Sequence, residues 1–267
     1  MKLNIFQKGS LIFFILIVLL WLYLAINHQT EGFLNYFYSF IFGLIPLIGG
    51  IIAMLRAKLW GKSAMGKAVF FTGLGLFLWG MGESIWSFYN FFLHVPAPYP
   101  SLADIGFAPS IFFYGLGAFY LAKVTGAKYG LRNPIAKVFL VLAPIAVLIL
   151  SYYVLIVVAR GGVLIPEGEP LLKIILDIAY PLGDFLGLTI AVIVSSLSFK
   201  YFGGIYLFDI FSILLGLAIM YIADSLFSYT TTVGSYYNGN FGDLLLATGL
   251  FLLTFGILGF CNKLKLE

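Results

Sequence analysis

Carboxylate side chains inside long apolar segments are the residues of this chain best able to do chemistry. Glu83, Asp184 and Asp224 each lie within an apolar stretch, and Asp104 and Asp243 stand near the start of one. An ionisable group in hydrocarbon is costly to bury, so each such acid is by default a candidate functional residue. No Lys or Arg falls in the hydrocarbon part of these stretches. The acids must therefore be protonated, accept hydrogen bonds, or bind a positive species from outside.

Helical spacing places these acids on faces shared with polar and aromatic side chains. Trp79 precedes Glu83 at i−4 and Trp86 follows it at i+3, so both indoles flank the carboxyl group. Asp224 repeats the arrangement, with Ser228 at i+4. These faces predict a site for a ligand that prefers carboxylates and aromatic rings.

A third face lies on the segment near residue 180. Asp177, Tyr180 and Asp184 fall at i, i+3 and i+7, and Pro181 predicts a local break just before the last of them. Asp184 is expected near the middle of the bilayer. The candidate ligand-binding residues are Trp79, Glu83, Trp86, Asp104, Asp177, Tyr180, Asp184, Tyr221, Asp224, Ser228 and Asp243.

The bound species expected from these side chains is positive. Phe, Tyr and Trp make up 18% of the chain, and aromatic faces beside carboxylates attract amines through cation–π contacts. A proton, a hard cation or a small amphiphile would fit the same groups. The alternative is that the acids, serines and tyrosines are structural, because membrane helices use such side chains as interhelical hydrogen bonds.

Composition places the chain in a bilayer. It is 62% hydrophobic and 10% charged over 267 residues, whereas a soluble domain carries about 25% charge. Eight apolar segments are each long enough to cross about 30 Å of hydrocarbon. We therefore predict an all-α, polytopic integral membrane protein with one transmembrane domain over residues 1–267. The predicted spans are 10–27, 33–55, 68–93, 104–123, 135–159, 171–199, 205–230 and 241–262.

The distribution of basic residues predicts the orientation. Thirteen of the fifteen Lys and Arg residues fall on one side of the eight predicted spans, and only Arg160 and Lys173 fall on the other. Cytoplasmic loops carry the excess of Lys and Arg. Both termini are therefore expected in the cytoplasm, and the predicted location is the cell membrane.

An internal repeat is predicted from two matched pairs of acids. Glu83 and Asp224 each precede Ser, two apolar residues and Ser, and they lie 141 positions apart. Asp104 and Asp243 follow at helix starts and lie 139 positions apart. The halves 1–130 and 131–267 would each hold four helices and enter from the same side, which makes the repeat parallel. Chance similarity between short apolar stretches is the alternative.

Other kinds of site have weaker support. The two histidines, His28 and His94, are expected at the outer surface, where a metal site with Glu83 or Asp104 is one interpretation and interfacial polar residues are the other. No cofactor is expected, the metal assignment is left open, and the net charge of +4 is no signal for nucleic acid.

Three motifs resemble a known family. They are "PSLAD", "YPLGD" and an "AD…GD" pair, and the matching positions are Pro100, Ser101, Ala103, Asp104, Tyr180, Pro181, Gly183, Asp184, Ala223, Asp224, Gly242 and Asp243. This pattern is similar to the multi-helix membrane module found N-terminal to bacterial GGDEF diguanylate cyclases, EAL phosphodiesterases and some histidine kinases. The resemblance spans roughly 68–262 and implies a sensory role. Only "NKLKLE" follows the last predicted span, so we expect no output domain and a signalling partner in the membrane or at the basic inner loops.

The leading functional prediction is a stand-alone sensory or ligand-binding membrane protein. Its outward acidic and aromatic pocket would take a cation, proton or small amphiphile from outside. A secondary transporter with Asp184 as coupling acid is the alternative. A membrane-embedded hydrolase or aspartyl protease is a third, on the strength of "PLGD" and "FGD", but the protease motifs are incomplete and we lean against an enzyme.

Overall fold

The computed structural model describes residues 3–125, 134–158, 160–163, 170–198 and 206–261, apart from some side chains within the helices. The described residues form helices and no strands. Each of the eight predicted segments contains one α-helix. The helices are α1 (Ile5–Ile26), α2 (Phe33–Ala57), α3 (Ala64–Leu93), α4 (Asp104–Val124), α6 (Pro134–Ser151), α7 (Leu171–Ser198), α8 (Leu207–Thr232) and α9 (Phe241–Gly259). A 3₁₀ turn, Lys58–Trp60, continues α2, and a π-helical segment, Tyr152–Val158, continues α6.

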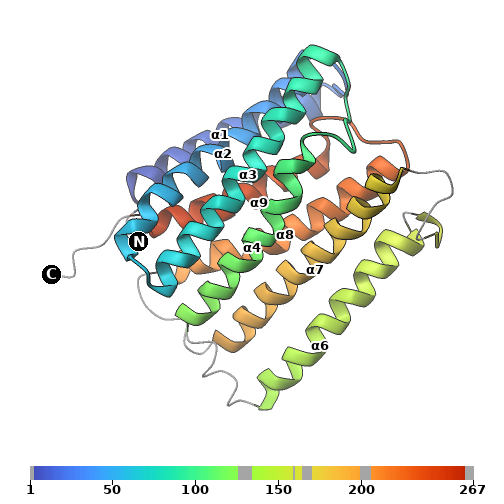
Figure 1. Cartoon of the computed structure of the whole chain (residues 1–267). Helices are drawn as coiled ribbons and strands as arrows, with labels where there is room; N and C mark the ends of the chain where they lie inside the picture. Colours follow the sequence, from blue (N-terminus) through green and yellow to red (C-terminus); the bar gives the residue numbers. More distant parts are fainter. Residues whose placement is uncertain (1–2, 126–133, 159, 164–169, 199–205, 262–267) are drawn as a thin grey trace.

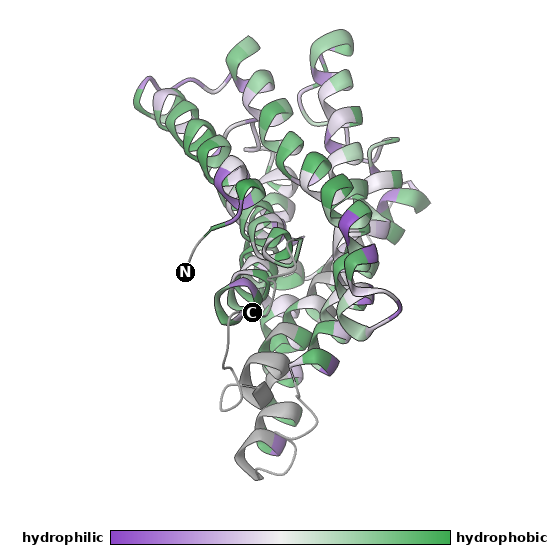
Figure 2. Ribbon diagram, turned by 90° about the vertical axis from the view of Figure 1, so that its left-hand side faces the viewer, coloured by the Kyte–Doolittle hydropathy of each residue, from purple (hydrophilic) through white to green (hydrophobic). Residues whose placement is uncertain are grey.

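Six of these helices are long and apolar enough to cross a bilayer: α1, α2, α3, α4, α8 and α9. Large apolar side chains cover their outer surfaces, as on α1, where Ile12, Leu16 and Leu19 are all more than half exposed. Figure 2 shows that hydrophobic residues predominate along the helices. Because exposed apolar surface of this extent is unfavourable in water, the helices indicate a multi-pass membrane protein.

Six helices form a closed ring. The order around it is α2, α3, α4, α7, α8 and α9, and α9 packs back against α2 (Figure 1). The first helix, α1, lies outside the ring against α2 and α9, and α6 lies outside it against α7. Within the ring α3 also touches α9, and α4 touches α8. This arrangement brings the two halves of the chain face to face.

Local capping decides where the helices begin. Asn4 and Gln7 form a capping box, so α1 starts at Ile5 rather than at the predicted residue 10. Ser63 accepts a hydrogen bond from the Gly66 backbone N–H, so α3 starts four residues before its predicted start. The sequence prediction used the apolar run alone and therefore missed the polar first turns. In contrast to these early starts, α9 is shorter than predicted, because it ends at Gly259, three residues before its predicted end.

The two ends of the helical ring carry different groups. At one end, here called the terminal end, Asn4 donates to the carbonyl of Leu258 (2.8 Å) and Gln7 donates to Asp209 (2.8 Å). At the other, the loop end, the connections 27–32, 94–103 and 233–240 meet (Figure 1). There the amide of Asn238 donates to the Pro96 carbonyl (2.9 Å). These contacts tie segments far apart in sequence at both ends.

Candidate ligand-binding cavity

A cavity of about 1110 Å³ lies inside the ring and reaches the segments at its loop end. All six ring helices contribute side chains to its wall. Ligand pockets in proteins have volumes of about 300–1,000 Å³, so this cavity is large enough for a drug-sized molecule. Apolar residues such as Phe42, Leu217 and Leu246 form part of its wall. Carboxyl groups and tyrosines form much of its polar lining, together with the basic residues Arg160 and Lys173.

Eight of the eleven candidate residues line this one cavity: Trp79, Glu83, Trp86, Asp104, Tyr180, Asp224, Ser228 and Asp243. Tyr221 is not among the lining residues, and its hydroxyl lies 3.0 Å from Ser151 in the second half of the chain. The side chains of Asp177 and Asp184 lie outside the described residues. The four described acids come from α3, α4, α8 and α9.

Glu83 lies on α3, well away from the loop end of this helix. It lies ten residues before the end of the helix at Leu93, about 15 Å along the axis. Only 4% of its surface is exposed, and it accepts a hydrogen bond of 2.7 Å from Ser39 on α2. Gly43 lets α2 approach this closely, because a Cβ there would lie 2.4 Å from the Glu83 Cγ. Ser39 and Gly43 therefore set the position of the carboxyl group.

Asp243 stands in the first turn of α9 and is also buried. The backbone N–H of Gly239 donates to it over 2.7 Å, and the Tyr236 hydroxyl lies within 3.3 Å of Oδ1. Gly239 adopts a φ of +86°, which favours glycine and aims its N–H at the carboxyl group. Desolvation, with the charges of Asp243 and Glu83, raises the pKa of Tyr236 well above its ordinary value. Tyr236 thus stays protonated beside two carboxyl groups.

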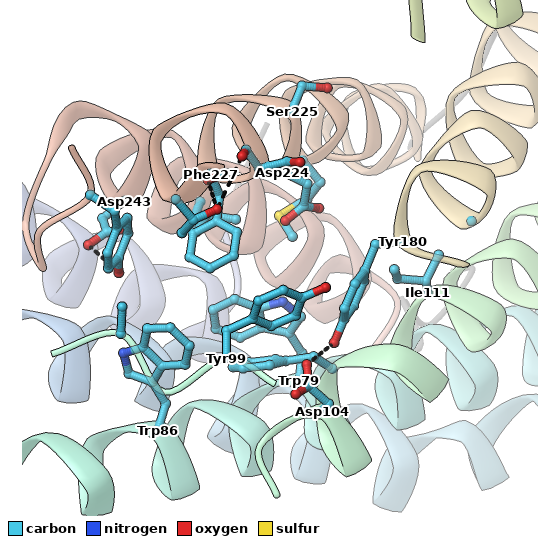
Figure 3. A pocket seen from close by; sticks show the side chains of 18 of the residues that line it. Trp79, Trp86, Tyr99, Asp104, Ile111, Tyr180, Asp224, Ser225, Phe227 and Asp243 are labelled. Carbon is cyan, nitrogen blue, oxygen red and sulfur yellow. Dashed lines mark hydrogen bonds between the residues drawn. The ribbon is translucent and has the colours of Figure 1, made fainter. Parts of the chain in front are cut away.

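Asp104 begins α4, where a negative charge suits the helix dipole. The backbone N–H of Ser101 donates to one of its oxygens over 2.7 Å. The Tyr180 hydroxyl on α7 donates to the other over 2.5 Å. Figure 3 shows Tyr180 reaching across to Asp104 from the opposite half of the chain. Asp224, on α8, lines the same cavity.

Two basic residues, Arg160 and Lys173, share the cavity wall with the acids. Lys173 precedes Tyr180 by two helical turns, so it lies about 10 Å nearer the loop end of α7. Both bases, like Asp224, engage other groups of the protein. The rim of the cavity therefore carries both signs of charge, whereas the described ionisable groups farther in are acids.

Aromatic rings connect the acidic positions (Figure 3). The Phe227 ring lies 5.1 Å from Tyr236 and 6.4 Å from Tyr99, measured between centroids. Tyr99 in turn lies 6.3 Å from Tyr180, and Trp86 lies 5.9 Å from Phe227. Ring faces in such an arrangement attract ammonium groups and also accept alkyl chains.

Several buried polar atoms at or near the cavity lack a partner among the described residues. Tyr114 lines the cavity and is 5% exposed, and its buried hydroxyl has no such hydrogen bond. The hydroxyls of Ser87 and Tyr38 are also buried, and they too lack a hydrogen-bond partner among the described residues. Leaving a buried polar group unsatisfied costs roughly 1–3 kcal/mol.

Sequence reasoning missed several residues that build this site. Ser39, Tyr99, Tyr114, Tyr236 and Asn238 each contact an acid, line the cavity or tie its loops. Only Tyr99 carried a usable signal, because it falls in the proline-rich loop just before Asp104. The others depend on which helices lie side by side.

The described residues contain no cluster of three or more His, Cys, Asp and Glu side chains that could hold a metal ion. His28 and His94 are both exposed and both adopt positive φ, at a turn and at the end of α3. Neither lines the cavity.

No family model, no curated protein sequence and no solved structure matches this chain. The function must therefore be inferred from the side chains of the cavity. Their common property is a concentration of acidic and aromatic groups at one place between the two halves.

Proposed function

We propose that this chain is a sensory or ligand-binding protein of the cell membrane that takes a small cation or cationic amphiphile into its cavity. One observation carries the proposal: four carboxyl groups from four helices and both halves line a single cavity together with Trp79 and Trp86. Carboxylates supply charge-assisted hydrogen bonds to an ammonium group, and indole faces supply cation–π contacts.

The loop end would face outside, with eight spans and both termini in the cytoplasm. The bias of Lys and Arg toward the terminal end supports this orientation, since Arg56, Lys62, Lys67 and Lys123 all lie near helix ends on that side. A ligand would then enter from outside, past the segment 94–103 and the segment 233–240. The lipid bilayer covers the apolar exterior.

The packing pairs support the parallel repeat on which signalling would act. In the first half α1 packs on α2, α2 on α3 and α3 on α4; in the second α6 packs on α7, α7 on α8 and α8 on α9. Around the ring the halves meet through α4 with α7 and through α9 with α2, and α1 and α3 also contact α9. Binding between the halves would shift one against the other and pass the signal to a membrane or cytoplasmic partner, as the resemblance to sensory modules implies.

Intrinsic fluorescence tests the proposal directly, because Trp79 and Trp86 line the cavity whereas Trp21 and Trp60 do not. The full chain in lipid nanodiscs is titrated with alkylamines, tetramethylammonium and calcium chloride. We expect saturable fluorescence changes with the organic cations, retained in a Trp21→Phe control and lost when Trp79 and Trp86 are both replaced by Phe. No saturable change with any compound in the panel would refute cation binding in this cavity.

Movement between the halves is a separate measurement. Spin labels at the exposed positions Lys62 and Lys137 report on one half each. We expect their distance distribution to shift when a binding amine is added. An unchanged distribution at saturation would argue against sensing by relative motion of the halves while leaving binding intact.

A further inference from the structure

The four acids of the cavity lie on two pairs of touching helices, and one acid of each pair is bonded to a tyrosine hydroxyl. The Tyr236 hydroxyl is within hydrogen-bonding distance of Asp243, and Glu83 lines the same cavity. The Tyr180 hydroxyl donates to Asp104, and Asp224 also lines the cavity. The first pair lies on α3 and α9, which touch each other, and the second on α4 and α8, which also touch.

An aromatic wall separates the two pairs. From Tyr236 the rings follow in order through Phe227 and Tyr99 to Tyr180, with centroids 5.1, 6.4 and 6.3 Å apart. The side chains of all four of these residues line the cavity. An elongated ligand lying along it would meet a carboxyl pair at each end and ring faces in between.

We infer that the cavity takes a linear molecule with two ammonium groups joined by an alkyl chain, one ammonium at Glu83 and Asp243 and the other at Asp104 and Asp224. This inference rests on the proposed function and names its ligand class. An alkyl spacer suits the rings because it buries apolar surface without demanding further hydrogen bonds.

Two bases at the rim, Arg160 and Lys173, would make the cavity select ligands by their charge. A dication entering past them is repelled at the mouth and attracted farther in, so its association is slower than its final affinity would suggest. An anion is held at the rim and repelled by the interior acids. The interior, with four described carboxyl groups, selects for positive charge.

A matched pair of probes tests the inference on the unaltered chain. Titration calorimetry in nanodiscs compares diaminoheptane with aminoheptanol, which has the same spacer and only one ammonium group. Linking two binding events raises the overall affinity by roughly 100-fold or more, so diaminoheptane is expected to bind about that much more tightly. A series from diaminobutane to diaminodecane should show an optimum spacer length.

Neutral variants assign the two ends. Glu83→Gln and Asp104→Asn each remove one charge and keep an oxygen for Ser39 or Tyr180. Each should bring diaminoheptane close to the affinity of aminoheptanol. Glu31→Gln, at an exposed position on the loop end, is the control and should change neither ligand. Thermal unfolding of each variant shows whether it folds.

The outcomes separate the inference from the proposal beneath it. If the diamine and the amino alcohol bind equally well and both depend on Glu83 or Asp104, the cavity binds single cations and the two-ended assignment is overturned. If neither probe binds the unaltered chain and the fluorescence panel is silent as well, both the inference and the proposed function fail.

Discussion

The Tyr180 hydroxyl on α7 and the Asp104 carboxyl group at the start of α4 are hydrogen bonded across the interface between the two halves of the chain. The bond joins residues 76 positions apart. It fixes the carboxyl group at the cavity wall and links α7 to α4, one of the two places where the halves meet in the ring.

Replacing Tyr180 by Phe should loosen this junction. The change leaves Asp104 with the Ser101 N–H but without the hydroxyl, and loss of a bond to a charged group costs roughly 1.5–3 kcal/mol. Thermal unfolding in detergent is expected to show a lower midpoint. Tyr229→Phe on α8, a partly exposed tyrosine, is the matched control. Equal midpoints for the two variants would show that the bond contributes nothing to stability.

Substitution by alanine should lower the stability of the protein at Gly43 and should not lower it at Gly115. A Cβ at Gly43 would lie 2.4 Å from Cγ and 2.8 Å from Cβ of Glu83, so Gly43→Ala must push α2 away from α3. Overpacking of this kind costs about 1–3 kcal/mol. Nothing lies within 4 Å of a Cβ at Gly115, so Gly115→Ala should be neutral or stabilising by up to about 1 kcal/mol.

Thermal unfolding of both glycine variants measures the difference. A lowered midpoint for Gly43→Ala should be accompanied by weaker cation binding, because Glu83 lines the cavity. A Gly43→Ala protein as stable as the parent would mean that α2 and α3 are not in such close contact at this point.

Asn238 holds the loop end together. Its side chain is 2% exposed, accepts from the Trp86 indole N–H (3.1 Å) and donates to the Pro96 carbonyl (2.9 Å). Asn238→Ala leaves the buried Trp86 N–H without this partner, at a cost of about 1–3 kcal/mol, and leaves the Pro96 carbonyl with Asn90 alone. We expect faster proteolysis within 94–103. Asn27→Ala, where the amide bonds only locally to Tyr23, should cleave at the parental rate.

Cys261 should be inert in the folded protein. It is fully buried next to the end of α9, and this burial raises the pKa of its thiol to about 12. At pH 8 about one molecule in ten thousand then carries the reactive thiolate, whereas roughly a quarter of free cysteine molecules do. Alkylation by iodoacetamide is expected to be slow in the native state and fast after unfolding. Rapid native alkylation would show that this end opens.

Much of the helical structure could be predicted from the sequence. Apolar runs of about twenty residues predict helices, because backbone groups in hydrocarbon must form their hydrogen bonds within the segment. The runs around Glu83 and Asp224 placed each acid correctly inside a helix, and the runs that follow Asp104 and Asp243 placed these acids in first turns. Capping by Asn4 and Ser63 moved two helix starts, because polar first turns carry no hydropathy signal.

What only the tertiary structure decided is which side chains meet. Ser39 bonds to Glu83 across 44 positions, and Tyr180 bonds to Asp104 across 76. Such pairs depend on the order of helices around the ring, and similar apolar surfaces on every helix leave that order unspecified in a single sequence. The sequence by itself determined which acids lie in apolar helices. The packing of α4 on α7 and of α9 on α2 decided that four of them share one cavity.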